Sequence, residues 1–279
     1  MEHGTDRWAA GSTYEDFMGR WSRRLAPHFV AWLRIPPGTH WLDVGCGTGA
    51  LTKAICRHAD PASATGCDPA GSFIEYARAH TEDDRASYCV AGIGSLPSRV
   101  AGYGSVSSLF ALNFLPDPET ALDEMQAVAS SGGTISACVW DYAERMAFLR
   151  TFWDVAAGAD PAARDLDEGT RFPICQFEPL GDLFRAVGLR RVQCEAIEIP
   201  TEFTSFDDFW RPFLGGTGPA PSYVASLAAD HREELARKLR ETLPMRSDGS
   251  IRLTARAWAV RGTRAPASDG PDVHLIHRP

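Results

Sequence analysis

Three glycines at alternate positions follow an aspartate early in the chain, in the stretch Asp43-Val44-Gly45-Cys46-Gly47-Thr48-Gly49. The apolar residues before Asp43 predict a strand and the helical spacing after Gly49 predicts a helix, so the glycines lie in a tight turn. Such a turn needs glycine where the backbone takes unusual angles and where a ligand lies against the bare main chain. The Asp43 carboxylate suits a ligand that presents an ammonium or hydroxyl group. The stretch therefore predicts a ligand-binding turn.

This stretch resembles the first motif of the class I S-adenosylmethionine-dependent methyltransferases. Its Gly-x-Gly-x-Gly spacing differs from the Gly-x-Gly-x-x-Gly of dinucleotide-binding loops, and the Gly-Lys-Ser/Thr of a Walker loop is absent. The alternative is a glycine-rich turn of an ordinary α/β domain. The resemblance covers about residues 14–140 well and continues weakly to about residue 262. It implies S-adenosylmethionine as the cofactor and in-line transfer of its methyl group to a small molecule.

A second aspartate, Asp68, ends the next predicted strand about 20 residues beyond the glycines, where this architecture places a carboxylate on ribose hydroxyls. The alternative is a helix N-cap, because a helical pattern starts at Phe73. In the resembled family, a segment like Tyr14 to Trp21 lies over the cofactor; an amphipathic helix that only packs on the sheet is the alternative. The predicted cofactor-binding residues are Tyr14, Met18, Arg20, Asp43, Gly45, Cys46, Gly47, Asp68, Pro69, Gly92, Ile93, Leu109 and Phe110.

The third predicted strand ends differently from the family pattern. Relatives usually carry Gly-Asp-Ala before a Leu-Pro, and that aspartate binds the adenine amino group, whereas this chain has Ala91-Gly92-Ile93 in the register. Losing one such hydrogen bond costs about 1 kcal/mol, or several-fold in affinity. Backbone groups at Gly92 and Ile93 are the predicted replacement, with Ile93 packing on the adenine ring.

A general base is hard to assign from the sequence. Asn113 occupies the position after the fourth predicted strand that often holds a histidine, and an amide is no base near neutral pH. Tyr14 and His28 are the other catalytic candidates, and each also has a purely structural interpretation. No cluster of histidines or acids has metal-ligand spacing, so no metal is predicted. Alignment of the methyl donor with the acceptor is therefore expected to provide most of the rate enhancement.

Aromatic residues gather near the predicted site, which favours an apolar or ring-bearing metabolite as the methyl acceptor. Core packing of added helices is the alternative for those that come late in the chain. The predicted substrate-pocket residues are Trp21, Asn113, Trp140, Tyr142, Trp210 and Phe213.

Composition excludes several classes of protein. The 279 residues carry a formal net charge of −8, which argues against a broad nucleic-acid-binding surface. The seven cysteines are scattered and form no Cys-x-x-Cys, so they indicate core residues in a reducing cytoplasm. No apolar run approaches the ~20 residues that span a bilayer, and no signal peptide is recognisable. The expected protein is cytoplasmic, without membrane or nucleic-acid partners, and a monomer or homodimer.

The order of the predicted elements gives the fold class. Strands alternate with helices, which predicts a Rossmann-like doubly wound α/β sheet of seven mostly parallel strands with an antiparallel last strand. The predicted parts are an N-terminal arm and helical lid (1–35), a cofactor-binding core (36–200 and 251–262), a helical cap insertion (201–250) and a disordered tail (263–279). Pro27 is expected to divide the lid into two helices, and residues 156–172 are expected to be loop.

Three functions remain open at this point. The first is a small-molecule methyltransferase, for example of specialised metabolism. The second is a protein that keeps the fold and binds S-adenosylmethionine but performs a non-methylating reaction such as a cyclisation. The third is a non-catalytic metabolite-binding protein. Neither the substrate nor the accepting atom (oxygen, nitrogen or carbon) follows from the residues.

Overall fold

The computed structural model describes residues 14–216 and 218–266. The arm residues before Tyr14 and the tail beyond residue 266 therefore lie outside the described residues. The seven strands form one sheet in the order β3-β2-β1-β4-β5-β7-β6. Strands β1 to β5 are parallel to one another, and β7 is antiparallel to both β5 and β6. The predicted fold class is confirmed, including the antiparallel last strand. The strands are β1 (His40–Val44), β2 (Ser63–Asp68), β3 (Ala86–Val90), β4 (Tyr103–Leu109), β5 (Ala129–Trp140), β6 (Arg190–Phe203) and β7 (Ile251–Thr263).

Helices connect and cover the strands, as the right-handed crossovers of a parallel sheet require. Helix α2 packs on α3 and β6, α4 packs on β2 and β3, and α5 and α8 pack on the strands from β4 to β7. The α-helices are α2 (Arg20–Leu33), α3 (Ala50–His58), α4 (Gly71–Ala79), α5 (Pro118–Val128), α6 (Ala147–Ala159), α7 (Glu168–Arg171), α8 (Phe177–Ala186), α9 (Phe206–Trp210), α10 (Pro219–Ser226) and α11 (Ala229–Thr242). Shorter turns of other helical types are η1 (Glu15–Gly19), η2 (Leu112–Phe114), η3 (Pro161–Asp165) and η4 (Arg211–Gly215).

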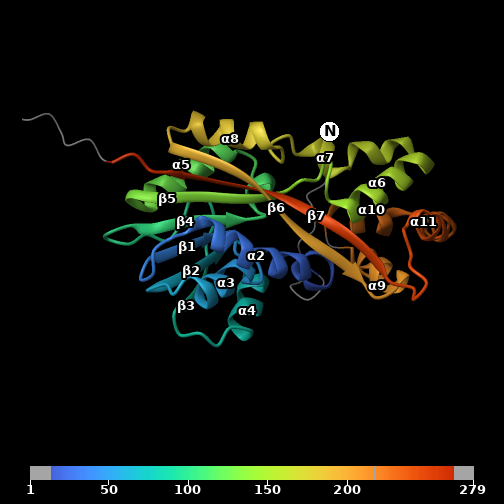
Figure 1. Ribbon diagram of the computed structural model, residues 1–279, viewed down its shortest axis with the longest axis horizontal. Helices are drawn as coiled ribbons and strands as arrows, with labels where there is room; N and C mark the ends of the chain where they lie inside the picture. The colour runs from blue at the N-terminus through green and yellow to red at the C-terminus, as the bar shows by residue number, and fades with distance from the viewer. Residues whose placement is uncertain (1–13, 217, 267–279) are drawn as a thin grey trace, which may run out of the picture.

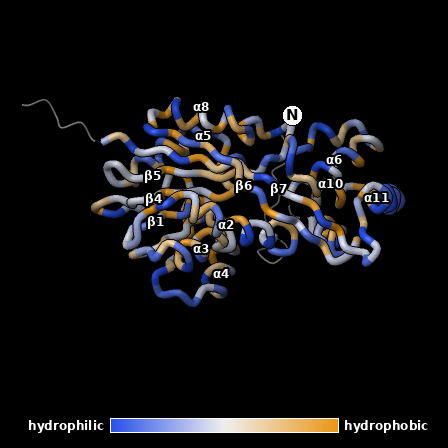
Figure 2. Tube along the Cα trace, viewed as in Figure 1, coloured by the Kyte–Doolittle hydropathy of each residue, from blue (hydrophilic) through white to orange (hydrophobic). Residues whose placement is uncertain are grey.

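Strands β6 and β7 pair from Arg190↔Thr263 to Phe203↔Ile251 and extend beyond the parallel strands. Figure 1 shows the two strands running out to the end of the molecule where α6, α9, α10 and α11 gather. The outer helix α11 is blue along most of its length in Figure 2, and its buried residues are Leu235 and Leu239. The elements α9 to α11 thus form a second helical group at the far end of the antiparallel pair.

Several predicted boundaries are wrong. Pro27 lies inside the continuous helix α2, because Leu25, Phe29 and Leu33 are buried in one core on both sides of it and this packing outweighs the lost hydrogen bond. The segment 156–172, expected to be loop, contains the end of α6 together with η3 and α7. Within the insertion, α10 ends and α11 begins near Leu227.

Asp117 caps α5, since its side chain accepts a hydrogen bond from the Thr120 backbone N–H at 3.1 Å and Pro118 follows in the first turn. All seven cysteines are free thiols, five of them buried. None of the helices among the described residues combines the length and apolar character that crossing a bilayer requires.

Candidate functional site

The turn after β1 takes backbone angles that favour glycine. Gly45 and Gly47 have φ values of +71° and +51°. A Cβ at Gly45 would lie 2.4 Å from the Cβ of Ala111, in the loop after β4, whereas a Cβ at Gly47 would meet no atom within 4 Å. Gly45 is therefore required by close packing of two loops, and Gly47 leaves open space into which a ligand fits.

Asp68, at the end of β2, joins the glycine turn to the neighbouring strand. Its Oδ2 accepts a hydrogen bond from the Gly47 backbone N–H at 3.0 Å, and its Oδ1 accepts one from the Ala70 N–H at 2.9 Å. Burial raises the pKa of the carboxyl group, although the two backbone hydrogen bonds act in the opposite direction. A carboxylate has about four acceptor positions, so Asp68 can still accept hydrogen bonds from a ligand.

Asp43 is fully buried at the end of β1 and is only half satisfied. Its Oδ2 accepts hydrogen bonds from the Thr52 backbone N–H at 3.0 Å and from the Thr52 hydroxyl at 2.7 Å. Its Oδ1 has no hydrogen-bond partner. Burial raises the pKa of Asp43 to about 7, with a further contribution from the nearby Asp68. A ligand with an ammonium or hydroxyl group would satisfy Oδ1 and favour the charged form.

The start of the N-terminal helix lies beside the same turn. Tyr14, Met18 and Ser22, spaced four residues apart, all line the pocket. The Tyr14 and Ser22 hydroxyls are 3.1 Å apart, and Ser22 donates to the Met18 carbonyl at 3.2 Å. The Thr48 hydroxyl, in the glycine turn, donates to the Glu15 carboxylate. The helix start is thus bonded directly to the turn.

Aromatic rings form another part of the wall. Phe110 stacks on Trp140, with ring centroids 4.1 Å apart and an interplanar angle of 8°. Phe110 has a φ of +60°, which is costly for a bulky residue and is typical of functional sites. Phe172 contacts the rings of both Phe114 and Tyr142, at centroid distances of 5.0 and 6.0 Å.

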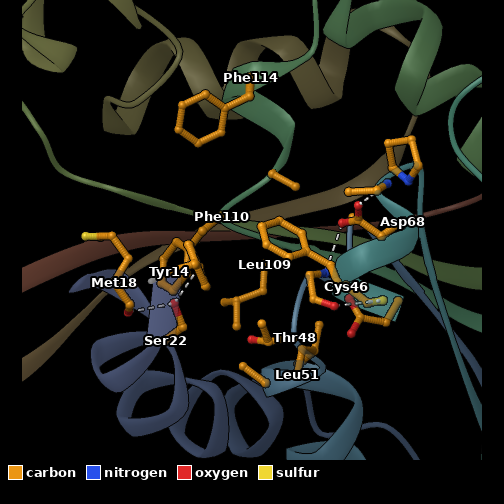
Figure 3. A pocket seen from close by; sticks show the side chains of 18 of the residues that line it. Tyr14, Met18, Ser22, Cys46, Thr48, Leu51, Asp68, Leu109, Phe110 and Phe114 are labelled. Carbon is orange, nitrogen blue, oxygen red and sulfur yellow. Dashed lines mark hydrogen bonds between the residues drawn. The ribbon is translucent and has the colours of Figure 1, made fainter. Parts of the chain in front are cut away.

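These parts enclose one pocket of about 300 Å³ at the carboxyl ends of the parallel strands, where open α/β sheets bind their ligands. Figure 3 shows Tyr14 and Met18 on one side of it and Asp68 on the other, with Leu109 and Phe110 between them. The lining residues are Tyr14, Met18, Ser22, Asp43, Gly45, Cys46, Gly47, Thr48, Ala50, Leu51, Asp68, Pro69, Ala70, Phe73, Leu109, Phe110, Ala111, Phe114, Leu115, Trp140 and Tyr142.

Comparison with known proteins agrees with this geometry. Residues 42–137 match the family model of a methyltransferase domain. Residues 42–137 are thus a methyltransferase domain of the class I S-adenosylmethionine-dependent type. A malonyl-[acyl-carrier protein] O-methyltransferase of Hahella chejuensis is 32% identical over 127 residues, 46% of this chain and 45% of that protein. A ubiquinone biosynthesis O-methyltransferase of Coxiella burnetii is 31% identical over 100 residues, 35% of this chain and 42% of that protein. The matched regions thus span less than half the length of these curated relatives.

The fold likeness extends over most of the chain. The crystal structure of the YcgJ protein of Bacillus subtilis superposes with a TM-score of 0.56 at 15% identity, and covers 89% of this chain and 100% of that one. At this identity the similarity concerns the fold alone.

S-adenosylmethionine, the cofactor of this domain, fits the residues of the pocket. Gly47 leaves the space that a Cβ would fill. The buried Asp43 Oδ1 has no partner and can accept from an ammonium or hydroxyl group. Asp68 keeps acceptor capacity beyond its two backbone hydrogen bonds. The structure places ten of the thirteen predicted cofactor-binding residues in the pocket wall: Tyr14, Met18, Asp43, Gly45, Cys46, Gly47, Asp68, Pro69, Leu109 and Phe110.

Three predicted cofactor-binding residues lie outside that wall. Arg20 points away from the pocket and forms an ion pair with Asp208, at 2.8 Å between Nη1 and Oδ1. Gly92 and Ile93, after β3, are half-buried but do not line the pocket. Gly92 instead accepts a hydrogen bond from the Ser95 backbone N–H at 2.9 Å in a tight turn. The predicted adenine contacts of Gly92 and Ile93 therefore stay predictions.

Three predicted substrate residues are part of the aromatic core and not of the pocket wall. Trp21 is fully buried, with its ring centroid 5.2 Å from that of Phe203. Phe213 stacks on Phe152 at 4.6 Å, and Trp210 stacks on its neighbour Phe213 at 5.9 Å. These rings pack against one another, which was the alternative interpretation. Trp140 and Tyr142 do line the pocket.

The catalytic candidates are dispersed. Tyr14 lines the pocket, and burial raises the pKa of its hydroxyl, which opposes a role as a base. His28 lies exposed on α2, away from the lining residues. Asn113 is buried beside the lining residues Ala111 and Phe114, and neither amide atom has a hydrogen-bond partner. Asn113 does not itself line the pocket.

Sequence reasoning missed several residues of the wall. Ser22 could have been predicted from helical spacing, because it lies one turn after Met18, as Met18 does after Tyr14. Phe73, whose ring lies 5.7 Å from that of Tyr14, could not, since the contact joins α4 to the N-terminal helix. The lining residues absent from the predicted set are Ser22, Thr48, Ala50, Leu51, Ala70, Phe73, Ala111, Phe114 and Leu115.

Proposed function

We propose that this protein transfers a methyl group from S-adenosylmethionine to a small, apolar or aromatic metabolite. The observation that carries the proposal is one enclosure that combines two buried carboxylates, Asp43 and Asp68, with the rings of Phe110, Phe114 and Trp140. The carboxylates suit the polar groups of the cofactor, and the rings suit an apolar acceptor.

The residues have separable roles in this proposal. Asp68 accepts hydrogen bonds from the ribose hydroxyls, and Asp43 accepts one through its unpartnered Oδ1. Gly47 allows the main chain to approach the cofactor. Tyr14 and Met18 cover the site as a lid and exclude water. The bound cofactor supplies an electrophilic methyl on a sulfonium, so the protein has only to align it with the acceptor.

We propose an oxygen as the accepting atom, because both curated relatives described above are named O-methyltransferases. The new carbon–oxygen bond forms as the carbon–sulfur bond breaks, which leaves S-adenosylhomocysteine and the methylated acceptor. The acceptor proton passes to water, since no histidine occurs among the described lining residues and the Tyr14 pKa is raised. Asn113 would act at most by holding the acceptor. Specialised metabolism and a cytoplasmic location stay predictions.

Two measurements test the proposal. Calorimetry with S-adenosylmethionine and S-adenosylhomocysteine should show binding, and absence of heat and of uptake up to millimolar concentration would refute it. Mass spectrometry of phenol- and enol-bearing metabolites after incubation should show the gain of one methyl group. Methylation of polar amines or nucleic acid alone would refute the proposed substrate class but not the cofactor.

A further inference from the structure

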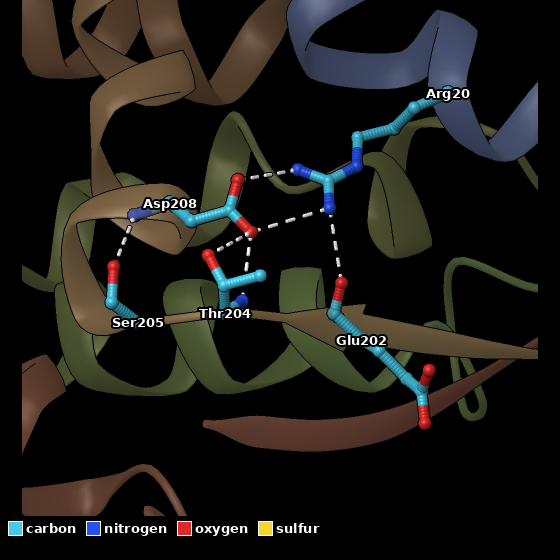
Figure 4. A network of polar contacts seen from close by, with 5 residues as sticks. All are labelled: Arg20, Glu202, Thr204, Ser205 and Asp208. Atoms are coloured by element: carbon cyan, nitrogen blue, oxygen red, sulfur yellow. Dashed lines mark hydrogen bonds and ion pairs between the residues drawn. The ribbon is translucent and has the colours of Figure 1, made fainter. Parts of the chain in front are cut away.

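Arg20 connects the N-terminal helix to a segment more than 180 residues away. Its Nη1 donates to Asp208 Oδ1 at 2.8 Å, and its Nη2 donates to the Glu202 carbonyl at 3.0 Å. Asp208 lies on α9, just after the far end of β6. The Asp208 carboxylate also accepts from the Thr204 backbone N–H at 2.9 Å. Figure 4 shows the guanidinium pointing from the helix toward this group.

The ion pair between Arg20 and Asp208 is partly buried and lies against two aromatic rings. Arg20 and Asp208 side chains are only 24% and 22% exposed. The guanidinium carbon lies 4.4 Å from the centroid of the Trp21 ring and 5.2 Å from that of Phe203. Partial burial, a two-point contact and ring stacking make such an arginine contact stronger and more directional than an exposed ion pair.

The position of Arg20 on the helix gives the contact a consequence at the pocket. Met18 and Ser22 line the pocket, and Arg20 lies two residues from each. At about 100° per residue, a side chain two residues away projects from the opposite side of a helix. A bond at Arg20 therefore opposes rotation of the helix that would turn Met18 and Ser22 out of the pocket.

We propose that Arg20 is a positioning residue for the cofactor site: paired with Asp208, it fixes the rotation of the N-terminal helix so that Tyr14, Met18 and Ser22 face the bound cofactor. The helix is then held at two points, by Arg20 on the segment after β6 and by Glu15 on the Thr48 hydroxyl of the glycine turn. Cofactor affinity thereby depends on the helical group between β6 and β7, which does not touch the cofactor. This inference rests on the proposed function for the identity of the ligand.

Binding of S-adenosylhomocysteine by calorimetry tests the proposal in Arg20→Met, Asp208→Asn and the double variant. Each single change should weaken affinity about five- to tenfold, because the helix samples unproductive rotations and the competent fraction falls. The double variant should be no weaker than the single ones, since both act through one contact. Arg20→Lys, which keeps the charge, should recover part of the affinity. Arg237→Met, which removes exposed ion pairs on α11, is the matched control and should leave affinity unchanged.

Two further readouts separate positioning from a general loss of structure. In the ligand-free protein, amide hydrogen exchange over residues 14–22 should quicken in both single variants and not in Arg237→Met. In steady-state kinetics, KM for S-adenosylmethionine should rise while kcat stays within about twofold of the wild-type value. This pattern is expected because the lost binding energy stabilises the bound cofactor and the transition state equally. Unchanged affinity in a folded Arg20→Met or Asp208→Asn protein, or fully additive effects in the double variant, would overturn the proposal. Absence of binding by the wild-type protein would instead overturn the proposed function.

Discussion

The substitution Asp43→Asn should change the stability of the fold and its affinity for the cofactor in opposite directions. An asparagine has the shape of the aspartate, and its carbonyl oxygen can keep both hydrogen bonds from Thr52. It cannot carry the negative charge that burial opposes. The fold therefore loses a buried charge, and the cofactor loses a charged acceptor.

The effect on stability depends on pH. The pKa of Asp43 is raised from 3.8 to about 7 in the folded protein, so the folded state retains a proton that the unfolded state has lost. Its contribution to stability is complete below pH 3.8 and falls as pH rises toward 7. The total change corresponds to about 4 kcal/mol, of which about 2.5 kcal/mol falls between pH 5 and pH 8. Relative to wild type, Asp43→Asn should gain about 2.5 kcal/mol in unfolding free energy over that interval.

Affinity should fall in the same variant. A hydrogen bond to a charged group is worth about 1.5–3 kcal/mol, so S-adenosylhomocysteine should bind Asp43→Asn about 10- to 100-fold more weakly at pH 8. Wild-type affinity should increase from pH 6 to pH 8 as Asp43 ionises, and this increase should be smaller in the variant. Urea unfolding and calorimetry at the two pH values measure the two effects.

Glu168→Gln provides the matched control. Glu168 is also buried, its pKa is raised to about 7 mainly by burial, and it accepts a hydrogen bond from the Trp153 indole. Glu168 does not line the pocket. Its glutamine variant should show a similar stability gain at high pH with no change in affinity. If Asp43→Asn binds as tightly as wild type, or its stability relative to wild type does not depend on pH, the reasoning about Asp43 is refuted.

Three further substitutions, the first with a matched control, test other parts of the site. Gly47→Ala and its control Gly38→Ala should each lower the free energy of unfolding by about 1 kcal/mol in urea, because both glycines have positive φ with open space around them. Only Gly47→Ala should weaken binding of S-adenosylhomocysteine in calorimetry. Equal affinities of the two variants would show that Gly47 does not face the ligand. Asp68→Asn can keep one of its two backbone hydrogen bonds and should bind adenosine and S-adenosylhomocysteine about tenfold more weakly. If the variant bound S-adenosylhomocysteine more weakly but adenosine as tightly as wild type, the proposed ribose contact would be contradicted. Phe114→Ala should raise KM for the acceptor in steady-state kinetics with little change in KM for S-adenosylmethionine, and the reverse pattern would place Phe114 at the cofactor.

The pocket wall formed by the glycine turn and Asp68 was predictable because its sequence signals are local. The turn from Asp43 to Gly49 and the strand end at Asp68 are each recognisable within a few residues. The parallel order of β1, β2 and β4 then brings these strand ends to one edge. Leu109 and Phe110 were predicted for the same reason, since they end β4. The strand order of the fold class therefore predicts that these residues, far apart in the sequence, lie close together.

The rest of the site depends on contacts that no local pattern encodes. Periodicity shows that the N-terminal segment is helical, but the face that each residue presents depends on what packs against it. Arg20 was expected at the cofactor and is bonded to Asp208, because the end of β6 and α9 lie against that side of the helix. The contact joins residues 188 positions apart. Composition likewise could not separate aromatic residues of the wall from those of the core.

The aromatic residues of the insertion nevertheless have a connection to the pocket. Phe213 stacks on Phe152 and contacts the ring of Phe17 at 5.2 Å. Phe17 is buried on η1, next to the lining residue Met18. The residues that were expected to touch the substrate thus pack behind the element that lines the pocket. Because closely packed rings resist displacement, changes in the insertion should reach the cofactor site through this helix, at the same place where Arg20 holds it.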